Sequence, residues 1–209
     1  MKTVFATSIA VTLLFVSALA NAQGRPDRAG PPPGVVPGDQ TIAEIVTESA
    51  SADPAEFSLL LAAIGYIAET NPDSALISGL FDKEQYTVFA PNDQAFLALV
   101  GAVAGLLDQD ILNNEGPFAA IDDLLGAGTI EAVVSYHVTE GRRASNSVVP
   151  RRGERSIETL LEGASFSVDS SGNIDAVGSD ATIVGPNTSA SNGVIHEIDA
   201  VLLPIDLGL

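Results

Sequence analysis

The segment from Asn192 to Pro204 constrains the fold of this chain more than any other. Asn-Gly at 192–193 is typical of a tight hairpin turn with positive φ values, and β-forming residues follow it. Alternate side chains of a strand face opposite ways, so one face carries four apolar residues and a histidine. These five are Val194, His196, Ile198, Ala200 and Leu202. The pattern predicts a strand over 194–203, with Glu197 and Asp199 facing water or a neighbouring loop.

His196 is the polar member of that apolar face. A buried imidazole needs a hydrogen-bond partner, and packing explains one inward histidine more simply than catalysis or ligand binding does. The alternation therefore favours a structural role for His196.

A second informative segment runs from Thr87 to Phe96. Thr87, Val88 and Phe89 are β-forming residues, whereas Pro91 cannot continue a strand ladder. Asn92 or Asp93 can then accept a backbone N–H as the N-cap of a helix. The segment predicts a strand that leads directly into a helix whose buried face starts at Phe96.

Together with Tyr136-His137-Val138 between them, these segments resemble the signature of the fasciclin-like (FAS1) domain. The resemblance covers roughly 41–204. It implies an α+β fold, a twisted, wedge-shaped β-sandwich with a layer of N-terminal helices, in one domain over 41–205. Its structural signature maps onto Thr87, Phe89, Pro91, Asp93, Asn192, Gly193, His196 and Asp199. It also implies adhesion or ligand binding rather than catalysis.

The first 40 residues have the composition of an export signal and a linker. The sequence predicts a signal peptide over 1–22. It has a positively charged residue near the N-terminus, Lys2, then an apolar run, and then the small residues Ala20 and Ala22 at the cleavage site. The alternative is a retained anchor, although the apolar run is short for a membrane span. Residues 23–40 are rich in Pro and Gly, which predicts an extended linker. We therefore expect a secreted or periplasmic protein, cleaved near Ala22, without stable membrane insertion.

Local patterns predict several helices in the N-terminal half. Thr41 and Glu44 match a capping box, and Asp53-Pro54 resembles a second helix start. The uncharged run 97–107 predicts a core helix. Residues 108–128 look like an insertion, with a short helix over 118–125.

In the C-terminal half, strands are expected at 130–138, where a helix end runs into one, and at 166–168, 174–177 and 181–184. A short helix is expected over 156–161. The turn 170–173 joins two of these strands in a hairpin. This hairpin explains the alternating Asp, Ser and Asn side chains of 169–175 better than a calcium loop, because the spacing of its glycine differs from that of an EF-hand.

The charge distribution is uneven. The chain carries 27 acidic and 9 basic residues, a net charge of −18, so removal of Lys2 with the signal leaves −19. Such a protein repels nucleic acid and anionic membranes. Five arginines nevertheless fall within fourteen positions and, with Glu154 subtracted, give that stretch +4. They are Arg142, Arg143, Arg151, Arg152 and Arg155.

Two explanations of this arginine-rich loop remain open. The arginines could pair with the protein's own carboxylates, or they could contact an anionic partner. Candidate partners are an anionic polysaccharide, phosphate headgroups, a cell-surface or matrix protein, or the acidic face of a second copy.

Catalytic and metal-binding signals are weak. The sequence has no nucleophile elbow, P-loop or H-E-x-x-H motif, so we expect no enzyme. It has no cysteine and two histidines, His137 and His196, both expected on strands. Two histidines make a poor zinc site, so no metal and no cofactor are expected.

Tyr136 and His137 match a family position associated with adhesion, which makes them candidate adhesion residues. Alternation places Tyr136 beside Val134 and Val138, on an apolar face. A tyrosine on such a face normally packs in the core and bonds through its hydroxyl, so core packing is the competing interpretation.

Three functions follow. The first is a non-catalytic module for adhesion or for interaction with extracellular matrix or polysaccharide. The second is a soluble carrier of an apolar ligand such as a carotenoid, with the helices at 57–68 and 96–107 lining a tunnel. The third, an enzyme, lacks any recognisable site.

Overall fold

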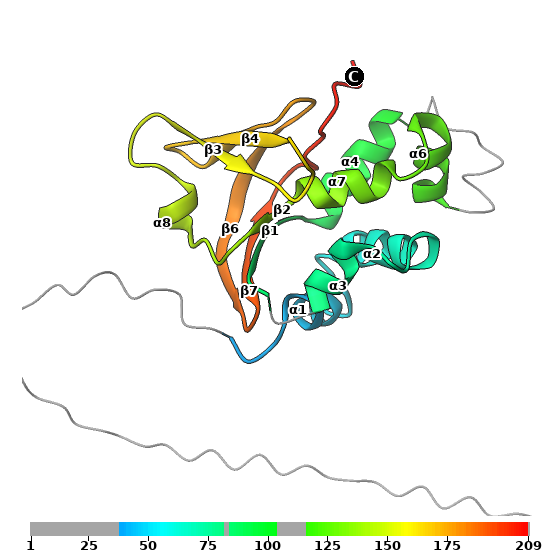
Figure 1. The fold of residues 1–209 in the computed structure, drawn as a ribbon, viewed down its shortest axis with the longest axis horizontal. Coiled ribbons are helices and arrows are strands. Elements are labelled where there is room, and N and C mark those ends of the chain that lie inside the picture. The colour runs from blue at the N-terminus through cyan, green and yellow to red at the C-terminus, as the bar shows by residue number, and fades with distance from the viewer. Residues whose placement is uncertain (1–37, 82–83, 104–115, 209) are drawn as a thin grey trace, which may run out of the picture. The chain divides into compact units, whose positions relative to one another are not determined.

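The computed structural model describes residues 38–81, 84–103 and 116–208. The signal peptide expected at 1–22 and most of the linker at 23–40 lie outside these residues. Figure 1 labels the helices and strands. The helices are α1 (Ile42–Ala50), α2 (Ser58–Thr70), α3 (Ala75–Phe81), α4 (Asp93–Val103), α6 (Pro117–Leu125), α7 (Thr129–Tyr136) and α8 (Ser145–Val148). The strands are β1 (Tyr86–Pro91), β2 (Val138–Glu140), β3 (Glu154–Glu158), β4 (Ser165–Asp169), β5 (Asn173–Asp175), β6 (Asp180–Ala190) and β7 (Gly193–Ile198).

The strands form a seven-stranded mixed sheet in the order β2-β1-β7-β6-β5-β4-β3. The pair β1–β7 is parallel, whereas the other neighbours are antiparallel. Strand β6 joins the two halves of the sheet, because residues 180–182 pair with β5 and residues from Ile183 onward pair with β7. Register shifts interrupt the β6–β7 pairing between Ile183 and Thr188, which lets the long strand bend.

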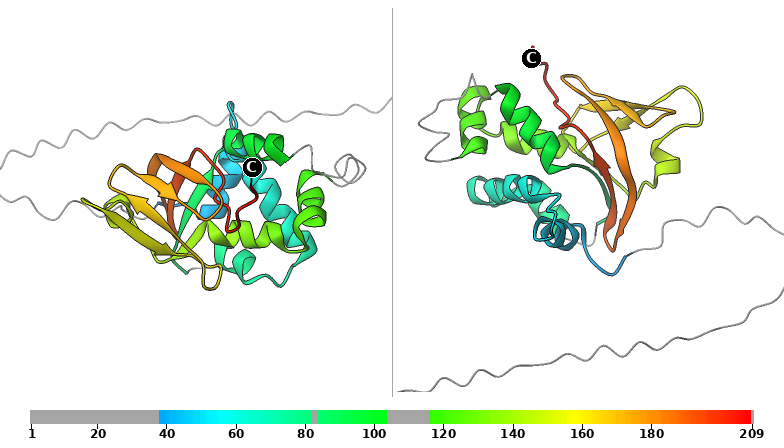
Figure 2. Two further views of the ribbon diagram at one scale, coloured as in Figure 1. Left: turned by 90° about the horizontal axis from the view of Figure 1, so that it is seen from above. Right: turned by 180° about the vertical axis from the view of Figure 1, so that it is seen from behind.

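Two apolar cores lie on opposite faces of the β1–β7 pair. Val88 and Ile195 are opposite each other in the register and face the helices, which supply most of the first core. Phe89 and Ile198 face the other way, toward the apolar residues of β3, β4 and β5. Figures 1 and 2 show α2, α4 and α7 on one side of β1 and β7, and β3 and β4 on the other. The α+β class with a helical layer is thus confirmed.

Three local predictions are confirmed by hydrogen bonds. The Thr41 hydroxyl accepts the N–H of Glu44 while the Glu44 carboxylate accepts the N–H of Thr41, which completes the capping box and lowers the pKa of Glu44. Asn92 accepts the Ala95 N–H at 3.0 Å, as an N-cap does. The 169–175 segment is a β4–β5 hairpin, as expected.

Two predicted helix features are wrong. Residues 156–161 were expected to be helical, but β3 covers Glu154–Glu158 because Ile157 pairs opposite Phe166 and is buried. Helix α2 starts at Ser58 and not at Pro54. Asp93 of α4 takes the place of a local cap, since its carboxylate accepts the Leu59 N–H at 2.8 Å and the Ser58 hydroxyl.

Three strand predictions also need correction. Tyr136 ends α7 and His137 is its C-cap, so neither lies on a strand. Strand β7 stops at Ile198 rather than 203. The hairpin turn lies one residue earlier than expected, at 191–192, and neither Asn192 nor Gly193 has positive φ.

The prediction of a core helix over 97–107 holds in part. Helix α4 buries Phe96 and Val103, but Leu97 is 63% exposed, so one side of the helix faces outward. Residues 104–107 lie outside the described part, as does the first part of the expected insertion, residues 108–115. The short helix predicted at 118–125 is confirmed as α6.

Candidate functional site

His196 is fully buried and hydrogen-bonded through both ring nitrogens. Its Nδ1 lies 3.2 Å from the Asn187 N–H, which can only donate, so Nδ1 accepts. The proton is therefore on Nε2, which donates to the Arg143 carbonyl at 2.9 Å. Burial lowers the pKa of His196, which favours the neutral ring. These contacts support the structural role expected for this histidine.

His137 has the opposite tautomer. Its Nε2 accepts the Leu202 N–H at 2.8 Å, so Nδ1 carries the proton and donates to the Val133 carbonyl at 2.7 Å. Burial lowers the pKa of His137 to about 4. In neither histidine does a ring nitrogen offer a lone pair to a metal. Within the described ranges, no three or more acidic or histidine side chains are grouped to hold a metal ion.

Tyr136 is completely buried, and its hydroxyl donates to the Ser165 carbonyl at 2.8 Å. Burial raises the pKa of Tyr136. His137 is 2% exposed. The candidate adhesion pair therefore lies in the core, and a partner would reach it only after the surrounding chain moved.

Two signature residues hold the start of the arginine-rich loop. The Thr87 hydroxyl donates to the Gly141 carbonyl at 2.7 Å and accepts the Arg143 N–H at 2.8 Å. His196 binds the carbonyl of the same Arg143. Thr87 and His196 thus fix the backbone of Gly141–Arg143, a connection that the separate strand patterns did not predict.

Other signature residues connect segments that are distant in the sequence, through hydrogen bonds and ring packing. The Asn192 side chain accepts the Ile42 N–H at 2.8 Å and thereby joins the β6–β7 turn to α1. Asp199 accepts the Thr182 N–H at 2.6 Å. The Phe89 ring packs edge-on against Phe166 across the second core.

The five arginines divide into two groups. Arg142 and Arg143 are half-buried at the base of the loop. Arg142 donates to the Ala190 carbonyl at 2.7 Å and the Ser189 hydroxyl, and Arg143 donates to the Glu140 carbonyl. Burial lowers the pKa of Arg142.

The other three arginines are exposed. Arg155 faces the side of β3 that carries Ile157 and donates to the Ser147 carbonyl, at the edge of the second core. Arg151 and Arg152 stand on a bend between the buried Pro150 and β3. We call Arg151 and Arg152 the arginine tip.

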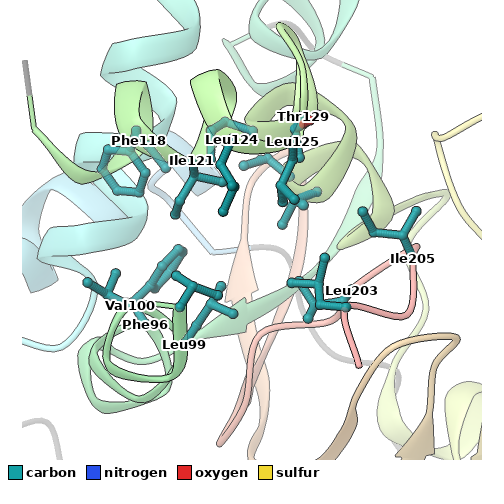
Figure 3. Close-up of a pocket in the computed structure, with 16 residues that line it drawn as sticks. Phe96, Leu99, Val100, Phe118, Ile121, Leu124, Leu125, Thr129, Leu203 and Ile205 are labelled. Atoms are coloured by element: carbon teal, nitrogen blue, oxygen red, sulfur yellow. The ribbon is translucent and has the colours of Figure 1, made fainter. Parts of the chain in front are cut away.

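A small apolar pocket lies between α4, α6, α7 and residues 203–207, with a volume of about 30 Å³. Figure 3 shows Phe118 and Ile121 of α6 above Phe96 and Leu99 of α4, with Leu203 beside them. A tunnel between the helices at 57–68 and 96–107 was expected. Helix α2 supplies only Ala63, while α6 and the C-terminal segment supply walls that the sequence did not indicate.

Within residues 38–81, 84–103 and 116–208, no helix has the length and apolar composition needed to cross a membrane.

The chain is similar in sequence to several known proteins. The immunogenic proteins MPB70 of Mycobacterium bovis and MPT70 of Mycobacterium tuberculosis are each 32% identical over 160 residues, or 76% of this chain and 68% of theirs. Protein sll1483 of Synechocystis is 32% identical over 157 residues, or 65% of this chain and 83% of its own.

A solved structure, the FAS1 domain pair of the insect cell adhesion molecule Fasciclin I, has 15% identity and a TM-score of 0.42. The alignment covers 68% of this chain and 44% of that one. The sequence model described as the fasciclin domain matches residues 67–204. The chain is a member of the fasciclin (FAS1) family.

Proposed function

We propose that this protein is a secreted or periplasmic, non-catalytic FAS1 module that binds an anionic cell-surface or matrix partner through the arginine tip. The observation that carries this proposal is the exposure of Arg151 and Arg152 at one bend, while Arg142 and Arg143 bind main-chain carbonyls at the base of the loop.

Arginine suits such a partner because its planar guanidinium forms two parallel hydrogen bonds with a carboxylate, sulfate or phosphate. The tip is also anchored at both ends. Thr87 and His196 hold the start of the loop, and β3 follows the tip through Gly153, whose φ is +70°. An anchored loop loses less conformational entropy on binding than a free one.

Retention on immobilised dextran sulfate tests the proposal. The parent should be retained and should elute as salt rises, because exposed charges are screened over about 8–10 Å at physiological salt. Arg151→Gln/Arg152→Gln should abolish retention. The control Arg25→Gln/Arg28→Gln changes the net charge equally in the predicted linker, and it should be retained like the parent. Equal retention of parent and tip variant would contradict the proposal.

A second candidate function is supported by the apolar pocket. All of its accessible lining is apolar, which suits an apolar ligand. Its volume of about 30 Å³ is far below the several hundred Å³ of ordinary ligand pockets. A carotenoid-sized ligand therefore requires the walls of the pocket to move apart.

A visible absorption spectrum of the protein from its native host tests the carrier function. A pigment band that is lost after Ile121→Asp, and kept after the exposed-site control Asp123→Asn, would support it. A colourless protein whose organic extract contains no apolar compound would contradict it.

A further inference from the structure

The outer face of β3, β4, β5 and β6 is polar and acidic. Val168, Ile174 and Ala181 are opposite one another in the register and point into the second core. Their neighbours along each strand therefore point outward. Five outward carboxylates line a depression of about 590 Å³, which we call the acidic face. They are Glu154, Asp169, Asp175, Asp180 and Asp199.

The register brings like charges together on this face. Glu154 lies directly opposite Asp169, and Asp175 lies directly opposite Asp180. Side chains in such positions are roughly 5 Å apart, and like charges there are destabilising. Hydrogen bonds from the backbone and side chain of Asn173 lower the pKa of Asp169, so its carboxylate remains ionised near neutral pH. Each of these two pairs sets like charges beside each other, so one guanidinium above either pair would meet two carboxylates at once.

The arginine tip borders this face. Arg152 is separated from Glu154 only by Gly153, so a positive and a negative patch adjoin on one surface. A surface of this kind is self-complementary in charge. A two-fold axis placed beside β3 would bring each tip over the acidic face of the other molecule, as in an isologous interface.

We propose that two copies of this chain associate through reciprocal contacts of the arginine tip with the acidic face. Each tip then lies above the opposed carboxylates of the partner copy and forms bidentate hydrogen bonds with them. Both molecules carry a large net negative charge, so the attraction is confined to this contact. The inference shares the tip with the proposed function but requires no polysaccharide.

Sedimentation velocity on two charge-reversal variants tests the contact. One variant is Arg151→Glu/Arg152→Glu, and the other is Asp175→Lys/Asp180→Lys, with all four positions exposed. The parent should show a mass that rises with concentration toward that of a dimer, and each variant alone should stay monomeric. An equimolar mixture should associate again, because both of its reciprocal contacts pair opposite charges.

Three outcomes would overturn the inference: a parent that is monomeric at every concentration, variants that associate like the parent, or a mixture that stays monomeric. Association that is lost on chelation would also overturn it, by indicating a divalent cation bridging the carboxylates. A monomeric parent that is still retained on dextran sulfate through the tip would leave the proposed function standing and reject only the dimer.

Discussion

The backbone N–H of Leu202 donates a 2.8 Å hydrogen bond to Nε2 of His137, across 65 positions of the sequence. The bond requires a neutral imidazole, and burial maintains that state by lowering the pKa of His137 to about 4. It attaches the segment after β7 to the end of α7, which faces both cores.

Stability should therefore fall as the solution is acidified from pH 7 to pH 5. The unfolded histidine has a pKa near 6.5 and binds a proton in this range, whereas the folded one does not. Stability rises with pH wherever the unfolded state binds more protons, so the His137 contribution is complete above about pH 6.5 and declines toward pH 4. The expected loss by pH 5 is about 2 kcal/mol from His137.

Urea unfolding at pH 7 and pH 5 measures this loss. His137→Gln should be less stable than the parent at pH 7 but should lose less between the two pH values. Burial also lowers the pKa of His196, but His196 is present in both proteins. The difference between the losses of parent and variant therefore measures the contribution of His137. Parallel losses in both proteins would show that His137 is not the group responsible.

His196→Ala should destabilise the fold by roughly 1–3 kcal/mol, because it leaves the Asn187 N–H and the Arg143 carbonyl unpaired. Amide exchange at Asn187 should accelerate at the same time. Urea unfolding and hydrogen exchange measure the two effects. A variant as stable as the parent that fails to bind a partner would instead indicate a functional histidine.

Asp93→Ala should lower the free energy of unfolding by about 1–3 kcal/mol, because the Leu59 N–H loses its acceptor at the first turn of α2. Asp123→Ala removes an exposed carboxylate from α6 and should change stability by less than about 0.5 kcal/mol. Thermal or urea unfolding compares the two. If both variants match the parent, the Asp93 contact does not stabilise the helix.

Export should produce a mature protein that starts at Gln23, because Ala20 and Ala22 fit the small-residue cleavage pattern. The intact mass of the exported protein, purified from the native host, shows at which residue the mature chain starts. Ala22→Arg should block processing and serves as the control. An exported parent that still begins at Met1 would exclude cleavage.

The sequence predicted those parts of the fold that depend on local chemistry. The capping box at Thr41, the N-cap at Asn92 and the 169–175 hairpin each depend on residues within a few positions of one another, and each is present. The inward direction of His196 followed from alternation within one strand.

The features that the sequence did not predict depend on contacts between residues far apart in the chain. Ile157, Leu160 and Leu161 suit a helix, yet the pairing of Ile157 with Phe166 makes the segment a strand. The start of α2 depends on Asp93, 34 positions beyond Leu59. The same limit applies to the candidate sites, because a run of arginines does not reveal which of them bind main-chain carbonyls.

Gly193→Ala gives the most direct test of the β1–β7 pairing. A Cβ at this position would lie 2.1 Å from the Tyr86 carbonyl oxygen, a backbone atom that cannot rotate away. The strands would have to separate, so we expect a loss of at least about 1–3 kcal/mol, as for overpacked cores. The control Gly65→Ala lies on an exposed part of α2 with no atom near the added methyl, and it should stabilise by up to about 1 kcal/mol. Urea unfolding of both variants should therefore give shifts of opposite sign, and a neutral Gly193→Ala would mean that β7 does not approach β1 this closely in solution.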